Sequence, residues 1–431
     1  MRRGRVLFLC HGHPGERPGG AENYAHDLHL ALRGSGEWEP IFLARTGPPQ
    51  SRSEWQPGTP RIRPIDATQD EYLLHTEGYD FDWLLGTMRH DKALYTTHLR
   101  DFLLATKPDV VHFQHTLFIG YDAIRMVRRT MPDVPIVYTL HEFLPICHHK
   151  GQMVRATDGE PCAEETPRRC HECYPHISPD AFALRKRYIQ SQLALVDMFV
   201  APSAVVHERF VRWGIPRERI LLEDYGRPPQ TSANTERIPP HRTLGFFGQL
   251  NPYKGIDVLL EAIGHLASRP EGHRPHLHVH GANLDLQDRA FRERVRALLD
   301  SCAGLVTSFG PYPPHRVGEL MAAVDWVVVP STWWENSPLV IQEAFAHRRP
   351  VICSDIGGMA EKVTDGRDGL LFPVGDAMAL ATTIRRAIET DGLWERLRAG
   401  VPATHVMDDH LAALGAAYDR LLNIRRAECA V

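Results

Sequence analysis

Short apolar runs, rich in β-branched and aromatic residues, alternate with helix-length segments along this chain. Such alternation is typical of βαβ units and therefore predicts parallel sheets covered by helices. In the first half the runs are RVLFLC, PIFLAR, DVVHFQ, PIVYTL and MFVAPS. After a polar, proline-bearing stretch the pattern restarts with TLGFFGQL, HLHVHG, VTSFG, DWVVVPS and RPVICSD.

The restart predicts two domains, because 431 residues exceed what one hydrophobic core usually supports. We expect a Rossmann-like domain over 1–226, a linker over 227–242 and a second Rossmann-like domain over 243–400. Residues 401–431 are expected to form a C-terminal helix that packs back on the first domain, and the Gly-, Pro- and Ser-rich stretch 45–66 a loop. Ligands of such doubly wound sheets bind at the carboxyl ends of the strands, so we expect the site in a cleft between the domains.

Composition and charge exclude several classes of protein. The formal net charge of −4 argues against a nucleic-acid partner. No apolar run reaches the roughly 18 residues of a membrane span, and the apolar stretch after the basic start is too brief for a signal peptide. We therefore expect a cytoplasmic protein whose eight cysteines lie in a reducing compartment.

The stretch STWWENSPLVIQEAF (331–345) follows a predicted strand and places two carboxylates around a helix start. Ser337 and Pro338 have the types expected of an N-cap and a first helical residue. The free amides that follow suit a phosphate, and Glu335 and Glu343 could reach the two ends of an elongated, centrally charged ligand such as a sugar nucleotide. The alternative is that both carboxylates are solvated surface charges.

Two glycine-rich loops also follow predicted strands. In TLGFFGQLNPYKGIDVLLEAI, Gly248 and Gly255 allow close backbone approach, Lys254 offers a charge for a phosphate, and a helix is expected near Ile256. The alternative for Lys254 is a solvated turn residue. Near the N-terminus, Gly19 and Gly20 precede a predicted helix and can present amides to an anion, although their loop does not fit G-x-G-x-x-G.

Histidines lie near the ends of two further strands. His141 and Glu142 follow PIVYTL, where residues that face a ligand belong, although a strand-end histidine is more often structural. His112 and His115 are in a similar position and rank below His141.

Four cysteines form a C-x14-C-x7-C-x2-C group inside a histidine-rich insertion over about 145–176, and they are Cys147, Cys162, Cys170 and Cys173. Four thiolates suit a structural zinc site. The alternatives are free or redox thiols, or an iron–sulfur cluster, and His148, His149 or His171 could replace one thiolate. Cys10, Cys302 and Cys353 are expected in the cores.

In this order the motifs resemble those of the retaining glycosyltransferases of family 4, which have the GT-B fold, in a subset with a cysteine-rich insertion. The resemblance rests on four motifs and on the C-terminal stretch SDIGGMAEKVTDGRDGLLFPVGD, and it spans nearly the whole chain. The motifs are GGAE at Gly19–Glu22, His141 after its strand, G-x5-KG from Gly248 to Gly255, and E-x7-E from Glu335 to Glu343.

The resemblance implies a nucleoside-diphosphate sugar as donor and no catalytic metal. Gly20 would approach the donor phosphate, Lys254 would neutralise the diphosphate, and His141 would lie at the reacting face of the sugar. Glu335 would hold the transferred sugar, and Glu343 the ribose hydroxyls. The remaining donor-site residues would be Gly19, Gly248, Gln249, Asn336, Ser337, Pro338, Leu339 and Val340.

One residue departs from the family pattern, since relatives commonly have an arginine where this chain has Gln249. Lys254 and helix dipoles could suffice, Arg17 or Arg227 could substitute, or activity could be weak. The rivals to a transferase are a sugar epimerase or phosphorylase of the same fold, and a catalytically silent scaffold.

The acceptor is left open between a glycan, a lipid-linked molecule and a small molecule, and so is the oligomeric state. A lipid-linked acceptor would bring peripheral membrane contact through Arg185, Lys186 and Arg187, for which the alternative is a solvated helix face.

Overall fold

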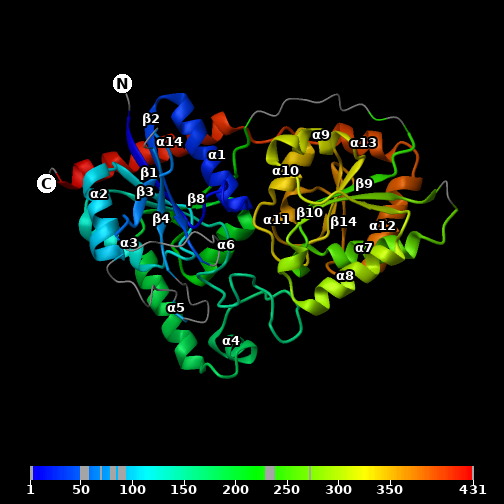
Figure 1. Ribbon diagram of the computed structural model, residues 1–431, viewed down its shortest axis with the longest axis horizontal. Coiled ribbons are helices and arrows are strands. Elements are labelled where there is room, and N and C mark those ends of the chain that lie inside the picture. The colour runs from blue at the N-terminus through cyan, green and yellow to red at the C-terminus, as the bar shows by residue number, and fades with distance from the viewer. Residues whose placement is uncertain are drawn as a thin grey trace. The chain divides into compact units, whose positions relative to one another are not determined.

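The computed structural model describes residues 3–48, 58–67, 70–77, 84–85, 94–228, 237, 239–270 and 273–429. The chain forms two compact units (Figure 1): Met1–Pro228 with Val406–Val431, here unit 1, and Pro229–His405, unit 2. Each unit is built on one predominantly parallel sheet, which confirms the predicted α/β class.

Unit 1 contains an eight-stranded sheet in the order β3-β4-β2-β1-β5-β6-β7-β8, in which β3 alone runs antiparallel to its neighbour. The order reverses between β1 and β5, so the loops after these two strands flank a topological switch point. The strands are β1 (Gly4–Cys10), β2 (Trp38–Thr46), β3 (Ile62–Pro64), β4 (Glu71–His75), β5 (Val110–Phe113), β6 (Ile136–Thr139), β7 (Met198–Ala201) and β8 (Ile220–Leu222).

The helices of unit 1 include one that returns from the far end of the chain. The last helix, α14 (Met407–Cys429), contacts α1, and its buried Tyr418 hydroxyl lies 2.7 Å from Nδ1 of His112. The others are α1 (Gly20–Ser35), η1 (Leu94–Leu99), α2 (Arg100–Thr106), α3 (Asp122–Thr130), α4 (Pro167–Cys173), α5 (Pro179–Leu193), α6 (Ala204–Trp213) and η2 (Arg217–Arg219).

Unit 2 contains a six-stranded, wholly parallel sheet in the order β11-β10-β9-β12-β13-β14, with its switch point between β9 and β12. Trp326 and Val328 face one hydrophobic cluster, whereas Val327 and Val329 face another, so helices bury both faces of the sheet. The strands are β9 (Thr243–Gln249), β10 (His276–Ala282), β11 (Val306–Ser308), β12 (Trp326–Val329), β13 (Val351–Ser354) and β14 (Gly369–Phe372).

The helices of unit 2 connect these strands. They are η3 (Pro252–Lys254), α7 (Ile256–Leu266), η5 (Leu284–Leu286), α8 (Arg289–Ser301), η6 (Pro314–Arg316), α9 (Val317–Ala322), α10 (Leu339–Ala346), α11 (Gly357–Lys362), α12 (Ala377–Glu389) and α13 (Leu393–Gly400). Helix α7 begins at Ile256, as predicted.

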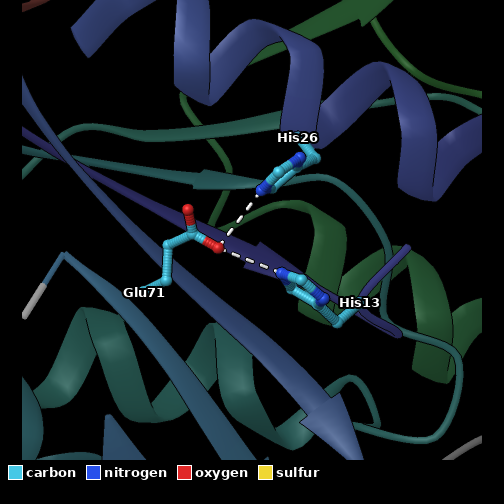
Figure 2. A group of neighbouring side chains, drawn as sticks. All are labelled: His13, His26 and Glu71. Carbon is cyan, nitrogen blue, oxygen red and sulfur yellow. Dashed lines mark hydrogen bonds and ion pairs between the residues drawn. The ribbon is translucent and has the colours of Figure 1, made fainter. Parts of the chain in front are cut away.

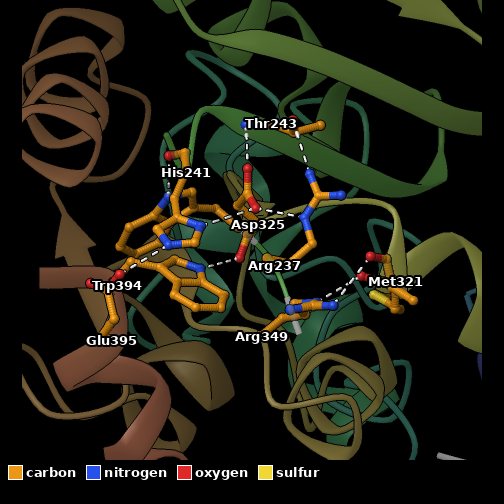
Figure 3. A network of polar contacts seen from close by, with 10 residues as sticks. Arg237, His241, Thr243, Met321, Asp325, Arg349, Trp394 and Glu395 are labelled. Atoms are coloured by element: carbon orange, nitrogen blue, oxygen red, sulfur yellow. Dashed lines mark hydrogen bonds and ion pairs between the residues drawn. The ribbon is translucent and has the colours of Figure 1, made fainter. Parts of the chain in front are cut away.

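A buried network fixes the amino-terminal edge of the unit 2 sheet (Figure 3). The Asp325 carboxylate is 1% exposed and accepts from the Arg237 guanidinium at 2.7 Å and the Thr243 amide at 2.8 Å. His241 stacks on Trp394 with ring centroids 3.8 Å apart, and the Trp394 indole donates to the Asp325 carbonyl at 2.8 Å. Because these residues lie at the opposite edge from the strands' carboxyl ends, we assign them a structural role.

The predicted loop over 45–66 is wrong in part. β2 continues to Thr46, and residues 62–64 form β3, while 49–57 lie outside the described residues. Strands β4, β8 and β14 were not predicted either. The expected core positions of Cys10, Cys302 and Cys353 are confirmed, since all three are buried.

Candidate functional site

The predicted donor residues of unit 2 lie at the end of β9, on the loops after β9 and β12 that flank the switch point, and in helix α10. Nζ of Lys254 lies 2.6 Å from Oε1 of Glu335, which brings these two residues together across 81 positions of sequence. The Glu335 side chain is 7% exposed and the Lys254 side chain 30%. The sequence predicted both residues at this site but not their direct ion pair.

Three donors converge on one oxygen of Glu335. Besides Lys254, the Ser331 hydroxyl donates to Oε1 at 2.7 Å and the Trp333 indole at 2.9 Å. A buried carboxylate needs such compensation for its lost hydration. Ser331 and Trp333 are therefore part of the site, although the sequence motifs gave neither of them a role.

Gly255 explains how the lysine loop reaches the end of β12. Its φ of 65° is favourable for glycine, and an added Cβ would lie 1.9 Å from the Pro330 carbonyl oxygen. The Asn251 side chain accepts from the Lys254 amide at 3.0 Å, and the Thr332 amide donates to the Tyr253 carbonyl at 2.9 Å. The two loops are thus joined backbone to backbone beside the ion pair.

Helix α10 begins at Leu339, so the prediction of Ser337 as N-cap and Pro338 as first helical residue is wrong. Pro338 is the cap residue: its ψ of 113° is extended, and its carbonyl already accepts from the Ile341 amide at 3.0 Å. The shift leaves Leu339 and Val340 as the first two helical residues, at the positive end of the helix dipole. Glu343 lies further along the same helix and is half-buried. Burial, and then the charge of Glu343, raises the pKa of Tyr312 above its usual range.

The start of α11 holds the loop that contains Glu335. The Gly358 amide donates to the Glu335 carbonyl at 2.7 Å, and a Cβ on Gly358 would lie 2.1 Å from the Asn336 carbonyl oxygen. In the sequence this glycine pair stands within the C-terminal stretch 354–376, and no contact was predicted for it. Oδ1 of Asn336 is buried and makes no hydrogen bond within the described protein, so it can accept one from a ligand.

Gly248 and Gln249 end β9 beside these loops. A Cβ on Gly248 would meet nothing within 4 Å, so there is open space next to its backbone. Gln249 is exposed, and its side-chain oxygen accepts from Asn251 Nδ2 at 3.3 Å.

In unit 1 the glycine pair lies after β1, at the switch point of that sheet. Gly19 is the N-cap of α1, which begins at the exposed Gly20. A Cβ on Gly19 would lie 2.4 Å from Oε2 of Glu22, whose Oε1 is 2.9 Å from Nε2 of His11. Burial alone would lower the pKa of His11, but the carboxylate of Glu22 and a hydrogen bond with Cys10 raise it to about 10.

His141 lies two residues beyond the end of β6 and is 8% exposed. Its Nδ1 is 2.7 Å from the Tyr225 hydroxyl and its Nε2 is 2.9 Å from the Gln114 side-chain oxygen. Since that oxygen can only accept, Nε2 carries the proton and Nδ1 accepts from Tyr225. Burial, and then the charge of His11, hold the pKa of His141 well below its usual range, so the ring is neutral.

Of the other residues near strand ends, His115 and Glu142 contact each other near His141, whereas His112 lies in the core. Nε2 of His115 is 3.3 Å from Oε1 of Glu142, and burial raises the pKa of that carboxyl to about 8. His112 instead hydrogen-bonds Tyr418 and Thr139 inside the core, which is a structural role. Gln114 and Tyr225, which orient His141, were missed because neither lies in a recognisable motif.

The four cysteines of the insertion line one pocket together with His148 and His149. Among the described residues, the four sulfurs do not all lie within 4.8 Å of one another. Binding of one metal ion would therefore bring them closer together. Four thiolate donors in a shared pocket fit zinc in their chemistry.

Arg185 holds this insertion and is not available to lipid. It is 5% exposed and donates to the carbonyls of Pro145 at 2.8 Å and Leu144 at 2.6 Å. Both expectations for the basic cluster, lipid contact and a solvated face, are therefore wrong for this residue. The helices of the described chain include none with the length and apolarity that crossing a bilayer requires.

Family models match both units. Residues 18–222 match a model described as Glycosyltransferase Family 4, and residues 241–390 match one described as Glycosyl transferases group 1. A D-inositol 3-phosphate glycosyltransferase from Jonesia denitrificans is 31% identical over 431 residues, 96% of each chain. The chain spans less than half of another such relative, from Nocardia farcinica, at 31% identity over 42% of each protein.

Solved structures show the same fold. Sucrose-phosphate synthase from Thermosynechococcus elongatus aligns with a TM-score of 0.71 and 18% identity, over 98% of this chain and 100% of that one. Anabaena HepE in complex with UDP and glucose aligns with a TM-score of 0.67 and 17% identity, over 97% and 100%. These matches confirm the GT-B fold, with its two Rossmann-like domains.

Proposed function

Because the chain belongs to the family-4 and group-1 glycosyltransferases, we propose that it transfers a sugar from a nucleoside-diphosphate sugar to an acceptor hydroxyl. The observation that carries this proposal is the Lys254–Glu335 pair, 2.6 Å apart at the switch point of unit 2 and on loops joined to each other. A cation and a buried carboxylate at that place suit the two halves of a sugar nucleotide, its phosphates and its hydroxyls.

The donor diphosphate binds Lys254 and the amides of Leu339 and Val340 in this proposal. The helix dipole and the lysine favour the same negative charge, which grows on the leaving diphosphate as the sugar departs. Open space beside Gly248 admits the phosphates, and the buried oxygen of Asn336 accepts from a donor hydroxyl or amine. Glu343 accepts from the ribose hydroxyls.

Glu335 and Lys254 exchange partners when the donor binds. The diphosphate, with more charge than one carboxylate, draws Lys254 away, while Ser331 and Trp333 keep Glu335 in place. The carboxylate then has room to accept from hydroxyls of the transferred sugar. This exchange gives the ion pair a role beyond stability, since a permanently paired lysine would neutralise no phosphate.

The acceptor binds unit 1 in this proposal, near His141, and the sugar is transferred with retention of its anomeric configuration. The neutral ring of His141 is oriented by Tyr225 and Gln114, so it acts through hydrogen bonding. The Jonesia relative, by its name, acts on D-inositol 3-phosphate, and this compound heads the panel of acceptors to test. UDP-glucose heads the panel of donors, because the HepE structure contains UDP and glucose.

The test measures nucleoside diphosphate release from a panel of nucleotide sugars, with and without acceptors, for the wild type and Lys254→Ala. We expect acceptor-dependent release that falls at least about 100-fold in the variant, a loss of about 3 kcal/mol in transition-state stabilisation. NMR of the product would show the donor's anomeric configuration. Release without any acceptor or inversion of configuration would contradict transfer with retention, and absence of turnover with every donor would favour the silent scaffold.

We also propose that Cys147, Cys162, Cys170 and Cys173 bind a structural zinc ion that stabilises the insertion. The support is their common pocket and their donor chemistry. Metal analysis of the wild type should give one thiolate-bound zinc that the Cys170→Ser/Cys173→Ser variant lacks.

A further inference from the structure

A group of histidine and carboxylate side chains, the residue types that can ligate a metal ion, lies in unit 1. Nε2 of His13, in the loop after β1, is 3.0 Å from Oε2 of Glu71, and Nε2 of His26 on α1 is 3.1 Å from the same oxygen. Figure 2 shows the two imidazoles and the carboxylate pointing toward one another. Their side chains are only 14%, 20% and 12% exposed, so little solvent reaches the group.

A third histidine, His29, points at the same carboxylate and makes no hydrogen bond. It is fully buried, and neither ring nitrogen has a hydrogen-bond partner. Its Nε2 lies 3.7 Å from Oε1 of Glu71 and 3.9 Å from Oδ2 of Asp70, beyond hydrogen-bonding distance. A buried imidazole without a partner is costly, and a separation of this size leaves room for an ion between nitrogen and oxygen.

We propose that His13, His26, His29 and Glu71 bind one divalent first-row transition-metal ion, with zinc the best match. Zinc bonds of about 2.0–2.1 Å to nitrogen and oxygen place neighbouring ligands of a tetrahedron about 3.3 Å apart. The separations from Glu71, between 3.0 and 3.7 Å, bracket this value. His13 and His26 approach Oε2 of Glu71 and His29 approaches Oε1, so the ligand atoms form two groups that share Glu71. Binding of one ion would therefore require the side chains of the two groups to move toward each other.

The types of the ligand atoms support the assignment. Nitrogen-rich sites with one carboxylate favour zinc and its neighbours over magnesium or calcium, which prefer oxygen ligands. Asp70 accepts from Arg33 at 2.8 Å, which holds a second carboxylate beside His29. The Arg33 guanidinium offsets the charge of this carboxylate and lies 4.0 Å from Oε1 of Glu71. The ligands come from the loop after β1, from α1 and from the start of β4, so the ion would cross-link three elements.

Metal binding would also change the glycine loop. The Gly15 amide donates to Nδ1 of His13 at 3.1 Å, which leaves the ring proton on Nε2. Coordination through Nε2 moves this proton to Nδ1, and the Gly15 amide must then turn away. The same loop continues to Gly19 and Gly20, so the ion would be a structural one that sets the conformation of the glycine pair.

The test uses the full-length protein with Cys170→Ser/Cys173→Ser, stripped with a chelator and titrated with Co²⁺. We expect one equivalent of bound cobalt with visible d–d absorption and no thiolate charge-transfer band. Adding Glu71→Gln should weaken binding about 100-fold, whereas Glu37→Gln, at an exposed carboxylate of the same unit, should leave it unchanged. The proposal would be overturned if the protein bound neither cobalt nor zinc at millimolar concentration. It would also be overturned if the proteins with Glu71→Gln and with Glu37→Gln bound the metal equally well.

A wild-type titration covers the case in which the cysteine variant does not fold. Two equivalents should then bind, and only one of them should produce the thiolate band. If every equivalent shows that band, the histidine group holds no metal. Neither result depends on turnover, so the proposal stands or falls separately from the transferase assignment.

Discussion

At the residue scale, the proposed sugar-nucleotide site depends on how many hydrogen-bond donors surround each buried charge. One oxygen of Glu335 accepts hydrogen bonds from Lys254, Ser331 and Trp333. The residue at the end of β9, by contrast, is the neutral and exposed Gln249. Family relatives commonly have arginine at that position, and a guanidinium can bind a phosphate with two hydrogen bonds. The chain therefore has one cationic side chain fewer at this position than the pattern that it resembles provides, and the proposed diphosphate site lacks that charge.

Gln249→Arg should strengthen the binding of nucleoside diphosphates. Because Gln249 is exposed and its side chain bonds the neighbouring Asn251, the substitution displaces no core side chain. A charge-assisted hydrogen bond to phosphate contributes about 1.5–3 kcal/mol, which corresponds to at least tenfold in the dissociation constant. Calorimetric titration measures it, with Gln249→Leu as the uncharged control. Equal affinities of wild type and Gln249→Arg would place the phosphate elsewhere.

His112 should make the protein less stable in acid. Burial, and then the charge of His410, lowers its pKa from 6.5 to about 3, so between these values the unfolded chain binds a proton that the folded chain does not. The free energy of unfolding therefore falls as pH decreases through this window, by roughly 5 kcal/mol in all. Urea unfolding of His112→Gln between pH 7 and pH 4 should give a flatter dependence than wild type. The exposed His176→Gln should keep the wild-type slope, and parallel curves for all three would contradict this explanation.

At the element scale, glycines set how closely the loops approach the strands. At Gly255 two constraints coincide, a φ of 65° and a backbone carbonyl 1.9 Å from the position of a Cβ. Gly375 has a similar φ of 72°, but nothing lies within 4 Å of its Cβ position. Comparing substitutions at Gly255 and Gly375 therefore separates the loss of stability that comes from the positive φ from the loss that comes from the steric clash with the carbonyl.

Gly255→Ala should destabilise unit 2 and weaken donor binding, because Lys254 is the preceding residue. We expect a loss of about 1 kcal/mol from the positive φ, as at Gly375→Ala, and at least about 2 kcal/mol more from the displaced loop. Thermal unfolding and nucleotide titration of both variants test this. Equal destabilisation in the two would show that the loop moves freely and that the close approach is unimportant.

The sequence predicted the central strands and the loops after them, because these strands are long apolar runs followed by glycine, proline or charged residues. It predicted the edge strand β11 but not the edge strands β3, β8 and β14, nor β4, which lies next to β3. It also missed Ser331, Gln114 and Tyr225, whose roles follow from contacts between segments far apart in the chain. The one-residue error at Pro338 arose because Ser337 and Pro338 have the residue types preferred at an N-cap and a first helical position, whereas the helix begins one residue later.

At the scale of the whole molecule, the chain crosses between its two units twice. Helix α14 returns to unit 1 and supplies buried groups there: the Tyr418 hydroxyl to His112, and His410 to both Tyr24 and Glu223 at 2.7 and 2.8 Å. Unit 1 therefore depends on residues that follow unit 2 in the sequence, whereas unit 2 is continuous in sequence.

Truncation after His405 should unfold unit 1 and leave unit 2 folded. The loss of Tyr418 and its neighbours opens the core of the first unit, while the contacts around Lys254 and Glu335 are all retained. Calorimetry should show one unfolding transition in place of the wild-type profile, and nucleotide binding should persist. Loss of nucleotide binding in a truncated protein that still shows the unit 2 transition would mean that unit 1 contributes to the donor site.

The proposed function depends above all on unit 2 binding a nucleoside-diphosphate sugar, and calorimetric titration with a panel of nucleoside diphosphates and their sugars measures that binding. Wild type, Glu343→Ala and Glu319→Ala, an exposed carboxylate of the same unit, are compared at one pH and salt concentration. We expect that one nucleotide binds selectively, that affinity falls at least about tenfold in Glu343→Ala, and that Glu319→Ala binds like wild type. Absence of binding by every nucleotide to folded wild-type protein would contradict the proposed function.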